Sequence, residues 1–488
     1  MHTVTFMPKG VSVEVEAGTS LLSAQILAGL RPDAPCGGNG TCGKCRVTLD
    51  SVSVLACETP VDRDMTVFLP ERSETEVLTD GIAANTAADG QYEYTAAFDI
   101  GTTTLAGFLL SGRSGRLLSS ASAVNPQTQY GADVISRIQT AISEEAPVLR
   151  RCVTDALVKL TEELAAKAGI SAGEIRLVSI VGNTAMHHLF LGIDPSSLVT
   201  PPYMPTISHA IEEPAGERLP IHSEGLLRIL PNIAGFVGAD TVGCMVATGF
   251  DRLRELTLLI DIGTNGEMVL GDSSRRIACS TAAGPAFEGA KISQGMRGAA
   301  GAVDHVRLEN GELGFHVIGE TTPVGICGSG LLDLVACLLD AGIIDDSGHM
   351  EGKVFTLPGT TVSLTQKDVR EVQLAKGAIR AGIELMCREM GVKPEEIRSV
   401  LLAGAFGNYL DPRSACRIGM IPPCLAERIH PVGNAAGAGA KMCAISREEY
   451  ERAKQLAAET DFLELASLPD FQDRFVDALE FYEDENDE

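Results

Sequence analysis

The chain has 488 residues, which corresponds to two to four domains at about 100–200 residues per domain. A hydrophobic fraction of 45% excludes a wholly disordered chain. Its 39 Lys and Arg against 65 Asp and Glu give a net charge of −26, which argues against nucleic acid or an anionic membrane surface as a partner. No apolar run is long enough for a membrane span, and the first residues lack a signal-peptide pattern, so we expect a cytoplasmic protein.

Four cysteines lie close together near the start of the chain. Cys36, Cys42, Cys45 and Cys57 have the spacing C-x5-C-x2-C-x11-C, and the first three share a glycine-rich loop. Four thiolates can hold two irons, and glycines allow backbone N–H groups to approach the sulfurs. The spacing therefore predicts a [2Fe–2S] cluster. Zinc is the alternative metal, although structural zinc sites usually use two closely spaced cysteine pairs and only Cys42 and Cys45 form one.

The segments around these cysteines predict a small α+β domain. Residues 4–6 and 11–16 alternate at the strand period, residues 21–30 have helical spacing, and residues 67–69 form a late strand. This order resembles the β-grasp fold of plant-type and vertebrate-type [2Fe–2S] ferredoxins over residues 1–72. Those ferredoxins have a longer gap before the fourth cysteine, so the connection from Arg46 to Ala56 is shortened here.

Two segments have the composition of a linker or a tail. Residues 73–94 begin with a mixture of Ala, Thr, Asp and Gly without a sustained period, so we expect a flexible tether between domains. Residues 463–488 end in an acidic stretch, which we expect to be a solvated tail, with a role in partner docking as the alternative.

Between them, strands alternate with helical stretches, which predicts an α/β unit with a first lobe at 95–257 and a second lobe at 258–462. One signal occurs in both lobes: an apolar strand ends in Asp-Ile-Gly-Thr. Glycine permits a tight turn whose N–H groups and threonine hydroxyls hold phosphate oxygens, and the carboxylate can hold Mg²⁺ through water. The residues concerned are Asp99, Gly101, Thr102, Thr103 and Thr104 in the first copy and Asp261, Gly263, Thr264 and Asn265 in the second.

A third strand enters a glycine-rich turn formed by Gly404, Ala405 and Gly407. Together the three segments resemble the phosphate-1, phosphate-2 and adenosine motifs of the superfamily of acetate and sugar kinases, heat-shock 70 proteins and actin. The resemblance implies a two-lobed α/β ATPase of the actin-like, ribonuclease H-like type that binds ATP with Mg²⁺. It places Asp99 and Asp261 in the catalytic set and the turn at 404–407 beside adenosine.

The sequence Ser-Thr-Ala-Ala-Gly-Pro-Ala-Phe-Glu-Gly supplies two further candidates. Gly284 is assigned to the nucleotide-binding set, and Glu288 to the base or orienter of the attacking water. An exposed or capping glutamate is an equally good interpretation of Glu288.

The combination of a ferredoxin domain with such an ATPase resembles the reductive activators of corrinoid proteins. The likeness covers nearly the whole chain, including FDIGTTT, NPQTQYGADVISRI, VGNTAMHHL, LIDIGTNGE and LLAGAFGN. It implies ATP-dependent transfer of one electron from the cluster to cob(II)alamin of a methyltransferase's corrinoid protein, which restores cob(I)alamin. It also implies an upstream electron donor such as a ferredoxin or flavodoxin.

Several alternatives stay open at this point. An activator of 2-hydroxyacyl-CoA dehydratases also couples ATP to a low-potential electron, a small-molecule kinase would use the ATP motifs alone, and a redox-binding module would not hydrolyse ATP. The sequence leaves the oligomeric state open, with a homodimer as one alternative.

Overall fold

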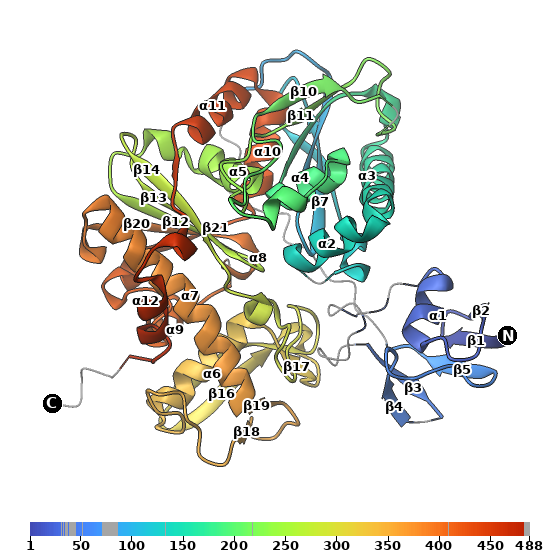
Figure 1. The fold of residues 1–488 in the computed structure, drawn as a ribbon, viewed down its shortest axis with the longest axis vertical. Helices are drawn as coiled ribbons and strands as arrows, with labels where there is room; N and C mark the ends of the chain where they lie inside the picture. Colours follow the sequence, from blue (N-terminus) through green and yellow to red (C-terminus); the bar gives the residue numbers. More distant parts are fainter. Residues whose placement is uncertain are drawn as a thin grey trace.

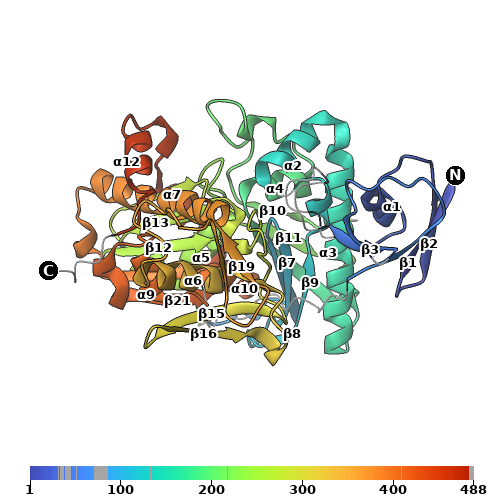
Figure 2. The ribbon, with the colours of Figure 1, turned by 90° about the horizontal axis from the view of Figure 1, so that it is seen from below.

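The computed structural model describes residues 1–30, 32, 34, 38, 45–50, 52–70, 86–131, 133–216, 218–407 and 409–482, with only the backbone of 144, 145 and 405. It has an N-terminal domain and two larger lobes (Figure 1). Figure 2 shows the N-terminal domain beside helix α3 (Ala146–Ala168) of the first lobe. Among the described residues, no helix combines the length and apolar character needed to cross a membrane.

The N-terminal domain is a five-stranded sheet with one helix, in the strand order β2-β1-β5-β3-β4. β1 pairs antiparallel with β2 and parallel with β5, so the first strand lies inside the sheet. Alternate residues such as Val4 and Phe6 form the core with Leu21 of the helix, as period-two burial requires. The elements are β1 (His2–Met7), β2 (Val11–Val15), α1 (Leu21–Leu27), β3 (Arg46–Leu49), β4 (Val52–Leu55) and β5 (Met65–Phe68).

The first lobe is built on a six-stranded sheet with the order β10-β11-β9-β6-β7-β8. Helix α3 covers one face, and α10 of the second half of the chain covers the other. Because both faces are covered, β6, β7 and β9 are buried along nearly their whole length. The strands are β6 (Tyr94–Ile100), β7 (Thr104–Ser111), β8 (Leu117–Val124), β9 (Ile175–Gly182), β10 (Ile211–Pro214) and β11 (Leu226–Ile229). The helices are η1 (Pro126–Gln129), α2 (Val134–Thr140), η2 (Ala141–Glu145), α3 (Ala146–Ala168), η3 (Ala172–Glu174), α4 (Thr184–Leu191), η4 (Ser196–Leu198), α5 (Ala239–Thr248) and η5 (Phe250–Arg252).

The second lobe repeats this plan with the strand order β21-β20-β12-β13-β14-β22, and α7 packs on β13 and β14. A smaller sheet of β15, β16 and β17 with helix α6 extends it. The strands are β12 (Thr257–Ile262), β13 (Gly266–Gly271), β14 (Arg276–Thr281), β15 (Ala302–Glu309), β16 (Glu312–Val317), β17 (Gly325–Ile326), β18 (Val354–Thr356), β19 (Ser363–Thr365), β20 (Ser399–Ala403), β21 (Ile429–Gly433) and β22 (Asp461–Phe462). The helices are η6 (Pro285–Glu288), η7 (Ile318–Glu320), α6 (Gly328–Asp340), α7 (Gln366–Met390), η8 (Pro394–Glu396), α8 (Gly404–Gly407), α9 (Pro412–Arg417), η9 (Pro423–Arg428), α10 (Ala435–Ile445), α11 (Arg447–Ala458), η10 (Leu465–Ser467) and α12 (Phe471–Asp477).

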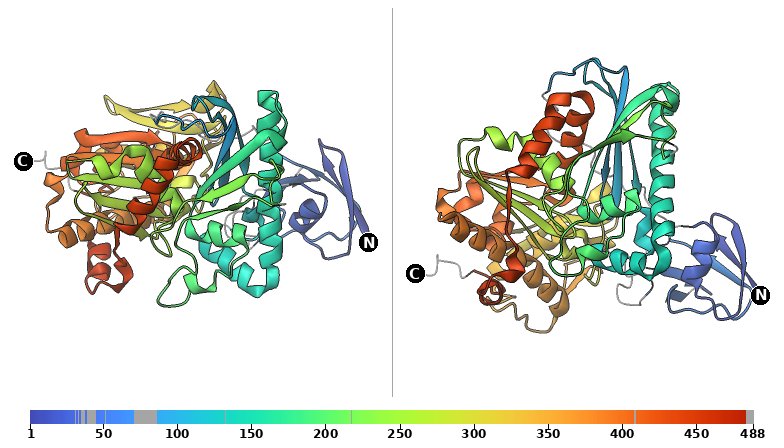
Figure 3. Two further views of the ribbon diagram at one scale, coloured as in Figure 1. Left: turned by 90° about the horizontal axis from the view of Figure 1, so that it is seen from above. Right: turned by 45° about the horizontal axis from the view of Figure 1, so that its top comes forward.

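Helices α5 and α10 cross between the two sheets, and their closest contact is made by glycines. A Cβ atom on Gly439 would lie 2.1 Å from the carbonyl oxygen of Gly243, so only glycine fits at this crossing. Helix α10, which the sequence analysis assigned to the second lobe, packs on β6 and β9 of the first. Figure 3 shows the orange and red helices beside the blue strands of the first lobe. The crossing brings the amino ends of α5 and α10 to the space between the lobes.

Two segments without helix or strand are held against the body of the protein. Within the linker expected at 73–94, residues 73–85 lie outside the described residues, and Thr86 donates to Glu449 Oε1 at 3.0 Å. Asp89 accepts the backbone N–H of Arg447 at 3.1 Å, which attaches the segment before β6 to α11. At the other end of the chain, residues 479–482 pack on α7 and α9, and Phe481 is buried.

Candidate functional site

The first Asp-Ile-Gly-Thr segment forms the hairpin between β6 and β7. The turn is tight: a Cβ on Gly101 would lie 2.7 Å from the carbonyl oxygen of Thr104. Asn125 holds the turn in place, because its Nδ2 donates to the Gly101 carbonyl at 2.8 Å and its backbone N–H donates to the Thr103 carbonyl at 2.9 Å. Asn183, which caps α4, donates to the hydroxyl of Thr102 at 2.8 Å. The two asparagines of the motifs NPQ and VGNTA therefore fix the backbone and hydroxyls of this turn.

The second copy forms the hairpin between β12 and β13. The Gly263 N–H donates to the Asn265 carbonyl at 2.9 Å, which closes the turn. Asp261 lies opposite Glu267 in the antiparallel register and beside Ala403 in the parallel register. Thr264 is buried at the tip.

Glu288 joins the two hairpins. It ends the short helix η6, and its two carboxylate oxygens each accept one threonine hydroxyl: Thr103 donates to Oε2 and Thr264 donates to Oε1, both at 3.3 Å. Thr103 belongs to the first lobe and Thr264 to the second. The two Asp-Ile-Gly-Thr turns, which lie far apart in the sequence, are therefore brought together on either side of Glu288.

Carboxylates gather close to the two turns. Burial, then repulsion from Asp261, raises the pKa of Asp99 to about 7, although a hydrogen bond from Asn434 Nδ2 at 3.2 Å opposes the rise. Burial and the same neighbour raise the pKa of Asp240 to about 7. The pKa of Asp261 is raised by burial, and that of Glu267 is raised well above its usual range by burial, Asp240 and Asp261. A set of acids that repel one another in this way favours a bound cation.

Asp240, Glu267 and Asn434 were not among the sequence candidates. Asp240 lies in the first turn of α5, and Asn434 caps α10, so the glycine crossing of these helices delivers both to the cleft. Glu267 could have been found from sequence, because it follows the second turn at the start of β13. Cys244 donates its thiol to Asp261 Oδ2 at 3.6 Å from the next turn of α5.

The carboxylate set alone does not enclose a metal ion. Within the described part of the chain, no three His, Cys, Asp or Glu side chains are grouped so that they could hold one.

The third predicted segment, Gly404–Gly407, forms α8 at the end of β20. Gly404 has a positive φ of +87°, and a Cβ there would lie 2.8 Å from Asp261 Oδ1, so the turn passes directly over that carboxylate. Phe406 stacks on Phe287 of η6 with ring centroids 5.1 Å apart and an interplanar angle of 4°. Gly284, at the start of η6, also has a positive φ. The side chain of Ala405 lies outside the described residues.

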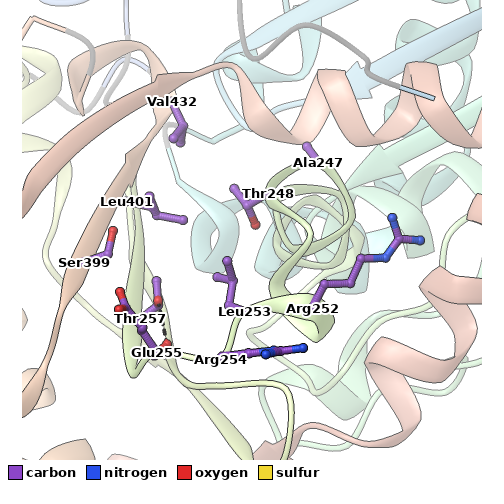
Figure 4. A pocket seen from close by; sticks show the side chains of 10 residues that line it. All are labelled: Ala247, Thr248, Arg252, Leu253, Arg254, Glu255, Thr257, Ser399, Leu401 and Val432. Carbon is purple, nitrogen blue, oxygen red and sulfur yellow. Dashed lines mark hydrogen bonds between the residues drawn. The ribbon is translucent and has the colours of Figure 1, made fainter.

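A cavity of about 470 Å³ lies where strands β12 and β20 of the second sheet begin (Figure 4). Thr257 at the start of β12 and Ser399 at the start of β20 line it, together with Arg252 and Arg254. Asp261 and Gly404 lie at the other ends of these two strands, so this cavity is separate from the cleft between the hairpins.

Of the four predicted cluster ligands, Cys36 and Cys42 lie outside the described residues. The Sγ atoms of Cys45 and Cys57 lie 3.3 Å apart, and the backbone N–H of Ala56 donates to the Cys45 carbonyl at 2.8 Å. Cys45 is buried and Cys57 half-buried. Two thiols at this separation can bind one metal ion, so this pair fits the ligand set of an iron–sulfur cluster.

Three protein-family models match the chain. The 2Fe-2S iron-sulfur cluster binding domain matches residues 4–68, the RACo middle region matches 94–253, and the C-terminal domain of RACo, the ASKHA domain, matches 255–488. ASKHA denotes the actin-like ATPase superfamily, so the predicted fold class, a [2Fe–2S] ferredoxin domain followed by an actin-like ATPase, is confirmed.

Similar proteins carry related names. Corrinoid activation enzyme RamQ of Eubacterium limosum is 36% identical over 413 residues, which are 78% of this chain and 69% of that protein. The [Co(II) methylated amine-specific corrinoid protein] reductase of Methanosarcina barkeri is 31% identical over 52% of this chain and 51% of its own length. A solved structure of a reductive activator for a corrinoid, iron-sulfur protein is 29% identical, covers 99% of this chain and 98% of that one, and has a TM-score of 0.72. The chain therefore belongs to the RACo family of corrinoid activation enzymes, as its sequence motifs predicted.

Proposed function

We propose that this chain hydrolyses ATP in the cleft between the β6–β7 and β12–β13 hairpins and uses ATP to support one-electron reduction of a partner corrinoid protein from cob(II)alamin to cob(I)alamin. The observation that carries the proposal is the position of Glu288, which accepts hydroxyls of Thr103 and Thr264 from the two lobes. A triphosphate bound there would contact both lobes at once, so its binding and loss can change their arrangement.

Residues of both turns would bind the nucleotide. The hydroxyls of Thr102, Thr103 and Thr264 and the N–H groups of the two turns are donors for phosphate oxygens. Gly404 and Gly407 would let adenosine lie against the backbone of the third turn. Glu288, once it no longer accepts the two threonine hydroxyls, would be free to orient the attacking water.

The carboxylates would hold Mg²⁺. Asp99 and Asp261, joined by Asp240 and Glu267, repel one another enough to raise their pKa values, and a divalent cation would stabilise their ionised forms. When bound, Mg²⁺ would supply positive charge to the phosphates during hydrolysis.

The N-terminal domain would supply the electron. Cys45 and Cys57, with Cys36 and Cys42, would hold the cluster, which when bound provides a one-electron carrier. An external donor of the ferredoxin or flavodoxin type would reload it. Each ~59 mV of unfavourable potential lowers a one-electron equilibrium constant tenfold. ATP binding and hydrolysis would offset this unfavourable free energy of electron transfer.

The direct test combines the anaerobically purified protein, a reductant, Mg-ATP and an isolated corrinoid protein in the cob(II)alamin state. Cob(I)alamin is followed by absorbance and the loss of cob(II)alamin by electron paramagnetic resonance. We expect reduction with ATP and little without it, and a variant such as Cys45→Ala should lose both the cluster signal and the activity. Equal rates with and without ATP would contradict the proposal.

A further inference from the structure

The connection between η4 and β10 differs from the rest of the chain in its composition. Residues 195–211 contain no Asp, Glu, Lys or Arg, whereas these four types make up 21% of the whole sequence. Within this connection the side chains of Tyr203 and Met204 are 38% and 61% exposed. Tyr203 has a φ of +60°, which residues other than glycine rarely adopt unless surrounding contacts hold them there. A loop that is uncharged, partly apolar and held in a strained conformation therefore lies at the surface of the first lobe.

The loop rests on the segment that precedes α5. A Cβ atom on Gly235 would lie 2.1 Å from the Tyr203 carbonyl oxygen, so only glycine allows this approach. Asn232 is buried and binds the loop twice: its backbone N–H donates to the Ser208 carbonyl at 2.9 Å, and its Nδ2 donates to the Ile207 carbonyl at 3.2 Å. Three contacts thus fasten residues 203–208 to residues 232–235.

The side chain of Asn232 also holds the beginning of α5. Its Oδ1 accepts the backbone N–H of Ala239 at 3.1 Å, and Ala239 is the first residue of that helix. The next residue, Asp240, is one of the buried carboxylates beside Asp261. Because one amide contacts both the loop and the helix end, a movement of the amino end of α5 is transmitted to the loop through a single side chain.

A second link runs from the loop to the first hairpin. The backbone N–H of Thr206 donates to Nε2 of His188 in α4 at 3.1 Å, and Nδ1 of the same buried ring donates to the Thr184 carbonyl at 2.7 Å. Helix α4 begins after its cap Asn183, whose Nδ2 donates to the Thr102 hydroxyl in the hairpin at 2.8 Å. The loop is thus connected to the first hairpin through α4 and to the carboxylates through α5.

We propose that residues 200–208 form part of the surface on which the corrinoid protein docks, and that the nucleotide in the cleft changes the affinity of this surface. The inference rests on the proposed function, since it locates the protein substrate of that reaction. The cores of protein interfaces are poor in charged residues and rich in Tyr and Met, which is the composition of this loop. In a chain with a net charge of −26, an uncharged loop also meets a protein partner without adding to the repulsion of acidic surfaces.

The links to the cleft favour the corrinoid protein over the external electron donor as the occupant. The donor reloads the cluster in the N-terminal domain, a step that needs no nucleotide. Corrinoid reduction is the step that ATP supports, so the corrinoid protein is the partner whose binding has to change with the bound nucleotide. By thermodynamic reciprocity, its binding changes the affinity for the nucleotide by the same factor.

The test uses the corrinoid protein that the wild-type chain reduces in the assay above, in its cob(II)alamin state. Its Kd is measured by anaerobic calorimetry with saturating Mg-ADP and with the saturating Mg complex of a non-hydrolysable ATP analogue that has an imido bridge. We expect Met204→Glu to raise the Kd by about tenfold or more, because it places a charge in an interface without charges. Val354→Glu is the matched control: it changes a 54% exposed valine of β18 in the second lobe and should change the Kd less than about twofold.

Asn232→Ala tests the link to the cleft, because it removes the side chain that joins the loop to α5. In the wild type we expect the Kd values of the corrinoid protein with the analogue and with ADP to differ about fivefold or more. In Asn232→Ala they should agree within about twofold. Thermal unfolding of the variant, and its own Kd for the analogue, are recorded with it so that a misfolded protein is recognised.

Three results would overturn the inference. Wild-type affinity in Met204→Glu would exclude the docking surface, and equal Kd values with the two nucleotides in the wild type would exclude the nucleotide link. A change from dimer to monomer in Met204→Glu, measured by light scattering, with an unchanged Kd for the corrinoid protein would assign the loop to a contact between two copies of the chain. Each of these results is compatible with ATP-dependent cob(I)alamin formation by the wild type, whereas a wild type without that reaction would contradict the proposed function and this inference together.

Discussion

The two hairpins share the sequence Asp-Ile-Gly-Thr, but their surroundings differ. In the first, asparagine amides from η1 and α4 hold the turn, and Asp99 accepts a hydrogen bond from Asn434. In the second, Asp261 lies among Asp240 and Glu267 and below the Gly404 turn. Under the proposed function, the first turn would hold phosphate and the second would lie at the centre of the cation site. The same four-residue motif would then serve two roles, which depend on the residues around each copy.

The largest expected difference is between the two aspartates. Asp261→Asn should lower the rate of ATP-dependent cob(I)alamin formation by about 100-fold or more, because it removes the central carboxylate of the proposed cation site. Asp99→Asn should cost only about tenfold, since an amide oxygen can still accept from Asn434. Rates at saturating Mg-ATP measure both. Equal losses would mean that the two hairpins contribute alike.

The matching glycines should differ in stability. In Gly101→Ala the new methyl group meets the Thr104 carbonyl oxygen at 2.7 Å, and backbone must move. In Gly263→Ala the nearest atom is Glu288 Oε1 at 3.8 Å, an ordinary contact. We expect Gly101→Ala to lower the free energy of unfolding by about 1–3 kcal/mol and Gly263→Ala to change it by less than about 0.5 kcal/mol. Urea unfolding of both variants gives the comparison, and a reversed order would contradict it.

The first hairpin should also be the more sensitive to acid. His187 lies in α4, whose cap Asn183 holds Thr102, and burial, then His188, lowers its pKa from 6.5 to about 3. Below pH 6.5 the imidazole of His187 binds a proton in the unfolded chain but not in the folded protein. Its contribution to the free energy of unfolding is therefore complete above pH 6.5 and is lost as the pH falls toward 3. The loss approaches about 1.4 kcal/mol per pH unit.

Unfolding free energies at pH 7.5 and 5.5 measure this effect. His187→Leu fills a similar volume without a titratable ring, so its pH dependence should be flatter than that of the wild type. A variant with the wild-type slope would assign the acid sensitivity to other groups.

The smallest effects are expected at the two threonines that contact Glu288. Thr103→Val and Thr264→Val each remove one hydroxyl, whose hydrogen bond to Glu288 is long at 3.3 Å, and keep the side-chain shape. Each variant should therefore lower the rate of ATP hydrolysis about two- to fivefold. Because both hydroxyls would bind the same triphosphate in place of Glu288, the double variant should lose less than the product of the single losses. A double variant that shows simple multiplication would indicate that the two turns do not act on one bound group.

The parts of the site that were predictable are those encoded in a few consecutive residues. Asp99 with Gly101 and Asp261 with Gly263 are visible because a strand, a carboxylate and a glycine turn follow one another in the chain. Asp240 and Asn434 reach the cleft only because α5 and α10 cross at Gly243 and Gly439, and such a tertiary contact leaves no local signal. The role of Glu288 depended on which hydroxyls it meets, which spacing alone could not decide.

One helix shows that a lobe is not a continuous stretch of the sequence. Helix α10 follows β21 of the second lobe directly but packs on β6 and β9 of the first. A boundary drawn along the sequence assigns each residue to one lobe, whereas this chain crosses back. Residues 86–91 have a linker composition, yet Thr86 and Asp89 are held by α11. The composition of a segment can predict that it forms no helix or strand, but it cannot predict the hydrogen bonds that hold the segment to the rest of the protein.

Residues 479–482 are held on the second lobe largely through their main chain. Gln373 donates to the Leu479 carbonyl at 2.9 Å, Lys376 donates to the Glu480 carbonyl, and Arg417 donates to the Tyr482 carbonyl at 2.7 Å. Only Phe481 enters the core, where it is 4% exposed. The segment is therefore held by three main-chain carbonyls and by the buried ring of Phe481, and the Tyr482 ring adds a contact with the Arg380 guanidinium. A chain cut before Phe481 would therefore lose the one side chain of this segment that fills the core of the second lobe.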